Sequence, residues 1–122
     1  MLTMYHGTRR SEFPRHEGLC LAETAAVARE YGIGASDDDE GVTVYRVTLD
    51  DDALSWEHLG AWDRDNAIAP GDTAKSRAAI IAEHGVCSVW YTDETPRGRA
   101  HETLRLLNAE ALDAIVSVEI VD

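Results

Sequence analysis

Apolar and polar residues follow one another in short runs, which predict strands separated by two clear helices. The strongest strand signal is the β-branched stretch from Val42 to Leu49, which Asp50 to Asp52 terminate. A strand at 2–8 breaks at Gly7, because glycine interrupts a β-prone run. Further short strands are predicted at 18–22, 86–92, 102–107 and 115–121.

Capping residues define where the helices begin and end. Thr24 is the expected N-cap of a helix over 25–31, and Gly32 is placed to end it. A second helix runs over 74–84, with Asp72 or Thr73 before it and Gly85 after it. A helical turn is predicted at 108–113, and a loop with a short helix at 53–72.

Together these elements predict an α+β domain of short, mostly antiparallel strands in a split sheet with two to three helices. The expected domain organisation is a single domain over residues 1–122. A chain of this length buries roughly two-thirds of the surface that its unfolded form exposes, which is enough for one core.

The formal charge of −12 excludes some classes of partner. Acidic residues gather at 37–40 and 50–52 and repel phosphate, so direct nucleic-acid binding is not expected. These runs are either solvated loops or a means of steering the protein toward a basic partner. No apolar run reaches membrane-helix length and the start does not resemble a signal peptide, so the expected location is the cytoplasm, with no membrane partner.

Cysteine and histidine are too sparse and too scattered to suggest a disulfide framework or a metal site. Cys20 and Cys87 are expected to be free, buried thiols. The five histidines do not pair at the short spacings of a zinc site, so no metal cofactor is expected.

Candidate chemistry is spread over four places in the chain. Tyr5-His6-Gly7-Thr8 stands near the start, Gly18 to Ala22 forms a strand that leads to a helix with Tyr31 near its end, and Glu102 heads a late strand. This order of histidine, tyrosine and glutamate resembles the His-Tyr-Glu signature of the diphtheria-toxin-like and poly(ADP-ribose)-polymerase-like ADP-ribosyltransferases. The resemblance covers nearly the whole chain and implies NAD+ as substrate.

The resemblance assigns the catalytic carboxylate to Glu102. Cleavage of the bond between nicotinamide and ribose passes through an oxocarbenium-like state, which a fixed carboxylate stabilises. The stretch from Trp90 through Arg97-Gly98 to Asn108 looks like the turn and strand that deliver this glutamate in the family. From spacing alone, Glu102 could equally be an outward residue of an edge strand.

The N-terminal motif is expected to hold the dinucleotide. The resemblance implies that His6 binds an adenosine-ribose hydroxyl, that the Gly7 backbone pairs with the nicotinamide carboxamide, and that Thr8 adds a ribose contact. Gly7 suits this role because a residue without Cβ permits close approach. A lone histidine after a strand can also be an ordinary satisfied polar residue.

Tyr31 is expected to stack on the nicotinamide ring, although it could instead be a core tyrosine on the buried face of its helix. Cys20 stands where many family members carry a second stacking aromatic. This departure implies weaker binding or another ring nearby, with Tyr5 and Tyr45 as candidates.

Acceptor recognition departs from the arginine-modifying members of the family. These carry a second glutamate two residues before the catalytic one, where this chain has Ala100, so arginine modification is not favoured. The family's acceptor loop corresponds to 93–101, which offers Arg97, Arg99 and His101.

The expected function is that of a mono-ADP-ribosyltransferase that uses NAD+ without metal. Its expected partner is a macromolecular acceptor, a protein with a basic surface, and its expected setting is that of a bacterial or phage effector, toxin or inhibitor of a defence system. Three alternatives stay open: an NAD+ glycohydrolase with the same pocket, an RNA phosphate-removing enzyme of a neighbouring branch, and a non-catalytic acidic mimic of nucleic acid.

Overall fold

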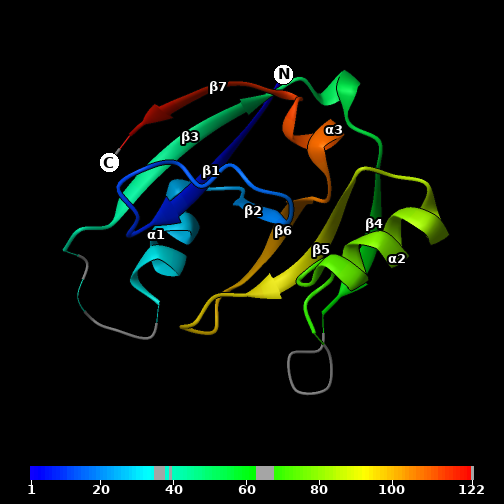
Figure 1. The fold of residues 1–122 in the computed structure, drawn as a ribbon. Helices are drawn as coiled ribbons and strands as arrows, with labels where there is room; N and C mark the ends of the chain where they lie inside the picture. The colour runs from blue at the N-terminus through cyan, green and yellow to red at the C-terminus, as the bar shows by residue number, and fades with distance from the viewer. Residues whose placement is uncertain (35–37, 39, 63–67, 122) are drawn as a thin grey trace.

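The computed structural model describes residues 1–34, 38, 40–62 and 68–121. Seven strands form one sheet in the order β4-β5-β6-β2-β1-β3-β7 (Figure 1). The strands are β1 Leu2–Thr8, β2 Leu19–Ala22, β3 Thr43–Leu49, β4 Trp56–Ala61, β5 Ser88–Glu94, β6 Ala100–Leu106 and β7 Ile115–Ile120. Among the described pairs, β4 and β5 run parallel and the others antiparallel.

In the part of the chain that the structure describes, three α-helices accompany the sheet, so the predicted α+β class is confirmed. They are α1 Ala25–Ile33, α2 Ala74–His84 and α3 Ala109–Leu112, with a 3-10 turn η1 at Asp51–Ala53. In the described part of the chain no helix has both the length and the apolar character that crossing a membrane requires.

The predicted helix caps are largely confirmed. The Thr24 hydroxyl accepts from the Val27 N–H at 3.2 Å, and Thr73 forms a reciprocal capping box with Ser76. The end of α1 was predicted two residues too early, because the cap is Gly34 and not Gly32. Gly32 continues the helix at a crowded point, where a Cβ would meet a Val42 methyl at 2.6 Å.

The segment 53–72 was predicted wrongly as a loop with a short helix. Trp56–Ala61 forms β4, an edge strand whose residues are mostly exposed. An edge strand with few buried side chains shows no apolar alternation, and its parallel partner β5 lies beyond α2 in the sequence. Residues 63–67 of the segment lie outside the described residues.

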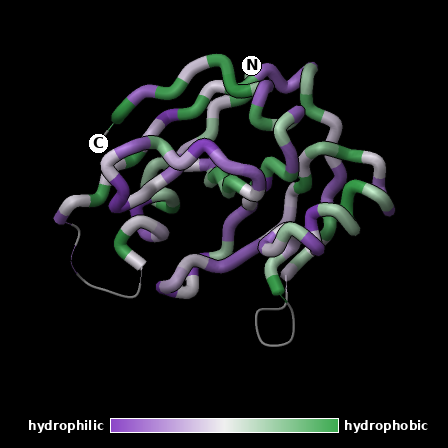
Figure 2. Tube along the Cα trace, viewed as in Figure 1, coloured by the Kyte–Doolittle hydropathy of each residue, from purple (hydrophilic) through white to green (hydrophobic). Residues whose placement is uncertain are grey.

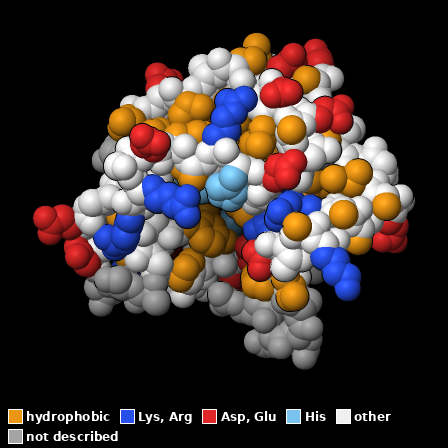
Figure 3. All heavy atoms as spheres, in the orientation of Figure 1, with side chains coloured by type: hydrophobic (Ala, Val, Ile, Leu, Met, Phe, Trp, Pro, Cys, Tyr) orange, Lys and Arg blue, Asp and Glu red, His pale blue; other side chains and the backbone are white. Residues whose placement is uncertain are grey.

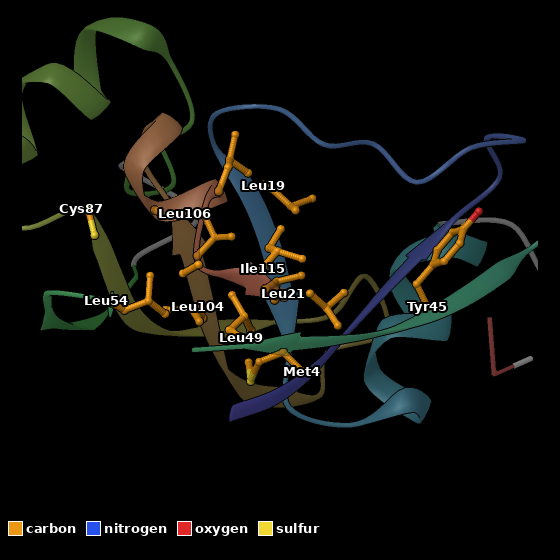
Figure 4. Close-up of a cluster of buried hydrophobic side chains, with 14 residues drawn as sticks. Met4, Leu19, Leu21, Tyr45, Leu49, Leu54, Cys87, Leu104, Leu106 and Ile115 are labelled. Atoms are coloured by element: carbon orange, nitrogen blue, oxygen red, sulfur yellow. The ribbon is translucent and has the colours of Figure 1, made fainter. Parts of the chain in front are cut away.

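Three apolar clusters cover the two faces of the sheet. The largest draws on β1, β2, β3 and β6 and is capped by α3 and β7; its side chains converge in Figure 4, with Tyr45 standing apart. On the opposite face, α1 packs over Val44 and Ala22, and α2 packs over Val89 and Tyr91.

The sheet splits between β1 and β2. β1 pairs with β3 along its whole length, from Leu2 opposite Leu49 to Thr8 opposite Thr43. By contrast, β1 and β2 share one Cα pair, Tyr5 opposite Ala22. The described residues show no further Cα pair between these two strands, so the pairing is shortest here within one continuous sheet. The hydrophilic loop over 9–17 joins the two strands (Figure 2).

α1 lies directly on the β1 backbone at Gly7. A Cβ at this position would come within 1.9 Å of the Ala28 carbonyl oxygen and 2.6 Å of its carbon. Both are backbone atoms of a helix, so neither can move aside without displacing α1. The glycine is thus needed for the packing of α1, independently of any ligand.

We expect Gly7→Ala to destabilise the protein by more than about 3 kcal/mol, beyond the usual range for overpacking. Gly98→Ala is a matched control, because a Cβ there meets nothing within 4 Å and faces only the strain of φ +84°. That strain costs about 1–2 kcal/mol. Urea unfolding of both variants measures the difference, and a Gly7→Ala cost no larger than that of Gly98→Ala would contradict the contact.

Candidate functional site

A cavity of about 330 Å³ opens where the pairing of β1 and β2 is shortest, and α1, β5 and β6 also contribute to its lining. The space-filling view shows a hollow in this face, with histidine and basic side chains around it (Figure 3). It is lined by Tyr5, His6, Gly7, Cys20, Leu21, Ala22, Ala28, Tyr31, Asp93, Thr103 and Arg105. Residues from five elements thus meet in one place.

His6 is held as a neutral imidazole with a defined tautomer. Its Nδ1 lies 2.8 Å from the Cys20 carbonyl oxygen, and since a carbonyl only accepts, Nδ1 must carry the proton. Nε2 is then the acceptor nitrogen. The Phe13 ring stands edge-on to the imidazole at 6.0 Å. Burial lowers the pKa of His6, with the Cys20 hydrogen bond acting in the opposite direction.

Tyr31 spans the cavity from α1 to the β5–β6 hairpin. Its hydroxyl lies 3.2 Å from an Asp93 carboxylate oxygen and 3.1 Å from the Glu94 carbonyl, and it also contacts His101 Nε2. Its ring meets the His101 ring edge-on at 5.2 Å. Burial and the Asp93 carboxylate raise the pKa of Tyr31, so the phenol stays protonated.

Asp93 is the one carboxylate among the described residues that line this cavity. It lies on β5 directly opposite His101 of β6. One of its oxygens faces the Tyr31 hydroxyl, and the other accepts from the Glu94 N–H at 2.7 Å. These contacts fix the carboxylate at the cavity wall.

A buried guanidinium completes the floor of the cavity. Arg105 Nε and Nη2 lie 2.9 and 2.6 Å from Cys20 Sγ, and Nη1 lies 3.6 Å from Asp72. The Arg105 side chain is 9% exposed and stands 5.9 Å over the Tyr91 ring. Burial opposes its charge, but the neighbouring Cys20 and Tyr91 outweigh that effect and raise the pKa of Arg105.

Glu102 does not reach this cavity. Alternate residues of a strand point to opposite faces, and Thr103 and Arg105 line the cavity, so Glu102 points to the other face. There its carboxylate contacts His58 Nε2 at 3.0 Å and accepts from the Thr92 hydroxyl at 3.3 Å. It lines a separate cavity of about 410 Å³.

The structure therefore brings His6, Gly7, Cys20 and Tyr31 together and leaves out two other predicted residues. Besides Glu102, Thr8 is absent from the lining; it is buried, and its hydroxyl accepts from the Arg10 N–H at 3.1 Å. Of the two candidate extra rings, Tyr5 lines the cavity, whereas Tyr45 packs in the main apolar cluster.

Of the predicted acceptor loop at 93–101, only Asp93 lines the cavity. Arg99 pairs with Glu30 of α1 at 3.3 Å, while His101 belongs to β6. In the acidic run at 37–40, Asp37 and Asp39 lie outside the described residues. The run at 50–52 forms the cap and start of η1.

Sequence reasoning missed Asp93, Thr103 and Arg105 as lining residues. The alternation of β6 was a usable signal, because it puts His101, Thr103 and Arg105 on one face once the strand is known to begin at Ala100. No sequence signal identified Asp93 as a lining residue, because its position at the cavity depends on the pairing of β5 with β6. In the described residues, no group of three or more His, Cys, Asp or Glu is placed to hold a metal ion.

No protein-family model matches this chain, and no curated protein matches it.

The neutral state of His6 predicts a specific pH dependence. Because the folded pKa lies below the unfolded value, protonation favours unfolding, so stability is full above about pH 6.5 and falls as the pH drops below it. We expect the wild type to lose more unfolding free energy between pH 7.5 and pH 5 than His6→Asn, which cannot titrate. Urea unfolding at both pH values measures this, and equal losses in the two proteins would show that His6 is not buried in the neutral form.

Proposed function

We propose that this chain is an NAD+-cleaving mono-ADP-ribosyltransferase whose pocket lies at the split between β1 and β2, with Asp93 as its carboxylate. The observation that supports this best is the convergence of His6, Gly7, Cys20 and Tyr31 on one cavity. These residues come from three elements, β1, β2 and α1, and the resemblance to ADP-ribosyltransferases points to all four of them.

The size and lining of the cavity suit part of a dinucleotide. At about 330 Å³ it is at the lower end of small-molecule pockets, so it can enclose the nicotinamide half while the adenosine half lies outside. Tyr31 and Tyr5 supply aromatic surface for the nicotinamide ring. Nε2 of His6 is available to accept a hydrogen bond from a ribose hydroxyl.

Arg105 offers charge to the pyrophosphate side of the ligand. It is the one guanidinium among the described lining residues, and it stays protonated despite its burial. A buried guanidinium forms short, directional hydrogen bonds to phosphate oxygens. Cys20 and Asp72 hold this side chain in place from two directions.

In the proposed reaction, the bond between ribose C1′ and the nicotinamide nitrogen breaks and its electron pair leaves with nicotinamide. The ribose then carries oxocarbenium character, which the Asp93 carboxylate stabilises because it is fixed at the cavity wall. A nucleophile on the acceptor forms the new bond to C1′ and loses a proton. That proton passes to solvent at the open side of the cavity.

The acceptor proposed for this reaction is a protein with a basic surface, which the net charge of −12 would attract. Water as acceptor would make the same pocket an NAD+ glycohydrolase, and the products separate the two. A bacterial or phage effector acting in the cytoplasm is the setting we propose.

Two conservative variants distinguish the proposed carboxylate from the one that the sequence suggested. We expect Asp93→Asn to slow nicotinamide release from NAD+ by about a hundredfold or more, because it keeps the shape and removes the charge. Glu102→Gln should retain turnover within a few-fold, since Glu102 faces the other cavity. The rate of nicotinamide release by chromatography gives the answer.

The reverse pattern, with Glu102→Gln inactive and Asp93→Asn active, would return the catalytic role to Glu102 and contradict the assignment to Asp93. If the wild type and both variants are folded but none of them cleaves NAD+, the proposed catalytic activity is contradicted.

NAD+ binding itself is expected to raise the melting temperature, because a ligand that binds only the folded state stabilises it by mass action. At a hundred times its dissociation constant the gain is about 2.7 kcal/mol. His6→Ala and Tyr31→Ala should reduce the shift, whereas Glu110→Ala, on the exposed surface of α3, should not. A melting temperature that saturating NAD+ leaves unchanged in the wild type would contradict the pocket.

A further inference from the structure

A second cavity, of about 410 Å³, lies on the face of the sheet opposite the proposed NAD+ pocket. Its walls combine tryptophan rings, leucines and carboxylates, with one histidine and one serine. The lining residues are Leu2, Glu23, Asp51, Leu54, Trp56, His58, Ser88, Trp90, Glu102 and Leu104.

Strand alternation builds the aromatic wall of this cavity. Trp56 and His58 share one face of β4, opposite Ser88 and Trp90 of the parallel strand β5. Trp56 is 57% exposed, the most exposed of the large aromatic side chains described. Tryptophan is enriched among the side chains that contribute most to protein–protein binding, so an exposed indole beside a cavity is a suitable contact for a partner.

Three carboxylates contribute acidic groups to the lining of the cavity. Glu102 is held by His58 and Thr92, and its backbone N–H donates to a Glu23 carboxylate oxygen at 3.2 Å. Glu23 and Glu102 therefore both contribute carboxylates to the lining of this cavity. Asp51, the third, lies 3.1 Å from the N-terminal ammonium. None of the described lining residues is a lysine or an arginine.

We propose that this cavity binds an arginine side chain on the surface of a partner protein. A guanidinium is the cation that meets both features, because its plane stacks on an indole ring while its N–H groups pair with carboxylate oxygens. A lysine ammonium is more strongly hydrated and has no plane to stack, and phosphate of a nucleic acid is repelled by the same carboxylates.

The arginine is a docking contact and not the site of modification, since the cavity and the proposed NAD+ pocket lie on opposite faces of the sheet. Arginine binding at this cavity does not require NAD+ cleavage. Through this cavity, an acidic protein would recognise a basic partner by specific contacts with an arginine side chain, in addition to the attraction from its net charge.

The test uses a blocked peptide, acetyl-Gly-Arg-Gly-Arg-Gly-amide, and the same peptide with citrulline, a neutral isostere, or lysine in place of arginine. The indole N–H signals of the three tryptophans are followed by NMR during titration. The arginine peptide should shift the Trp56 and Trp90 signals saturably and leave Trp62, which packs in the α2 cluster, unmoved. The citrulline peptide should bind at least about tenfold more weakly, since charge-assisted hydrogen bonds are about twice as strong as neutral ones.

Two matched variants separate the site from the overall charge. Glu102→Gln should weaken binding, whereas Glu110→Gln removes one charge from the exposed surface of α3 and should not. Trp56→Ala should weaken it about threefold or more through the lost cation–π contact. Equal loss in both glutamate variants, or equal shifts with citrulline, would overturn the site; a lysine peptide that binds as tightly would overturn the assignment to arginine.

Discussion

The contact between α1 and the backbone of β1 at Gly7 is the constraint on which the rest of the structure depends. Because there is no Cβ at Gly7, the Ala28 carbonyl can lie against the strand, and Gly32 permits a similarly close approach one turn later. Because α1 lies so close to the β1 backbone, the Tyr31 side chain reaches Asp93 and His101. Without this contact the cavity at the split of the sheet would lose one of its walls.

The two faces of β6 carry different chemistry. Thr103 and Arg105 line the cavity beside α1, whereas Glu102 lines the cavity that contains Trp56 and Trp90. A one-residue difference in strand phase therefore decides which carboxylate faces the proposed NAD+ pocket. The carboxylate that faces this pocket is that of Asp93, which lies on the neighbouring strand β5 and contacts the Tyr31 hydroxyl. The proposed function therefore assigns the catalytic carboxylate to Asp93 and not to Glu102.

Local sequence signals were sufficient for the elements that have strong caps or β-branched runs. Thr24, Thr73 and Gly85 define helix ends through backbone hydrogen bonds of their own neighbourhood, and 42–49 carries strand propensity residue by residue. β4 could not be read in this way, because an exposed edge strand is defined by its pairing with β5. Among the site residues, His6, Gly7 and Tyr31 were found through motif order. The direction in which Glu102 points was not, since it depends on the register of β6 against its neighbours.

The central claim is that the cavity at the split between β1 and β2 binds the nicotinamide half of NAD+. The most direct measurement is the two-dimensional NMR spectrum of the labelled protein, with backbone amides assigned, titrated with NAD+. The account predicts that the amide signals of Gly7, Cys20 and Tyr31 shift in a saturable manner, while those of Trp56 and Trp90 on the opposite face stay in place. Shifts confined to the Trp56 cavity, or no shifts at saturating NAD+, would contradict it.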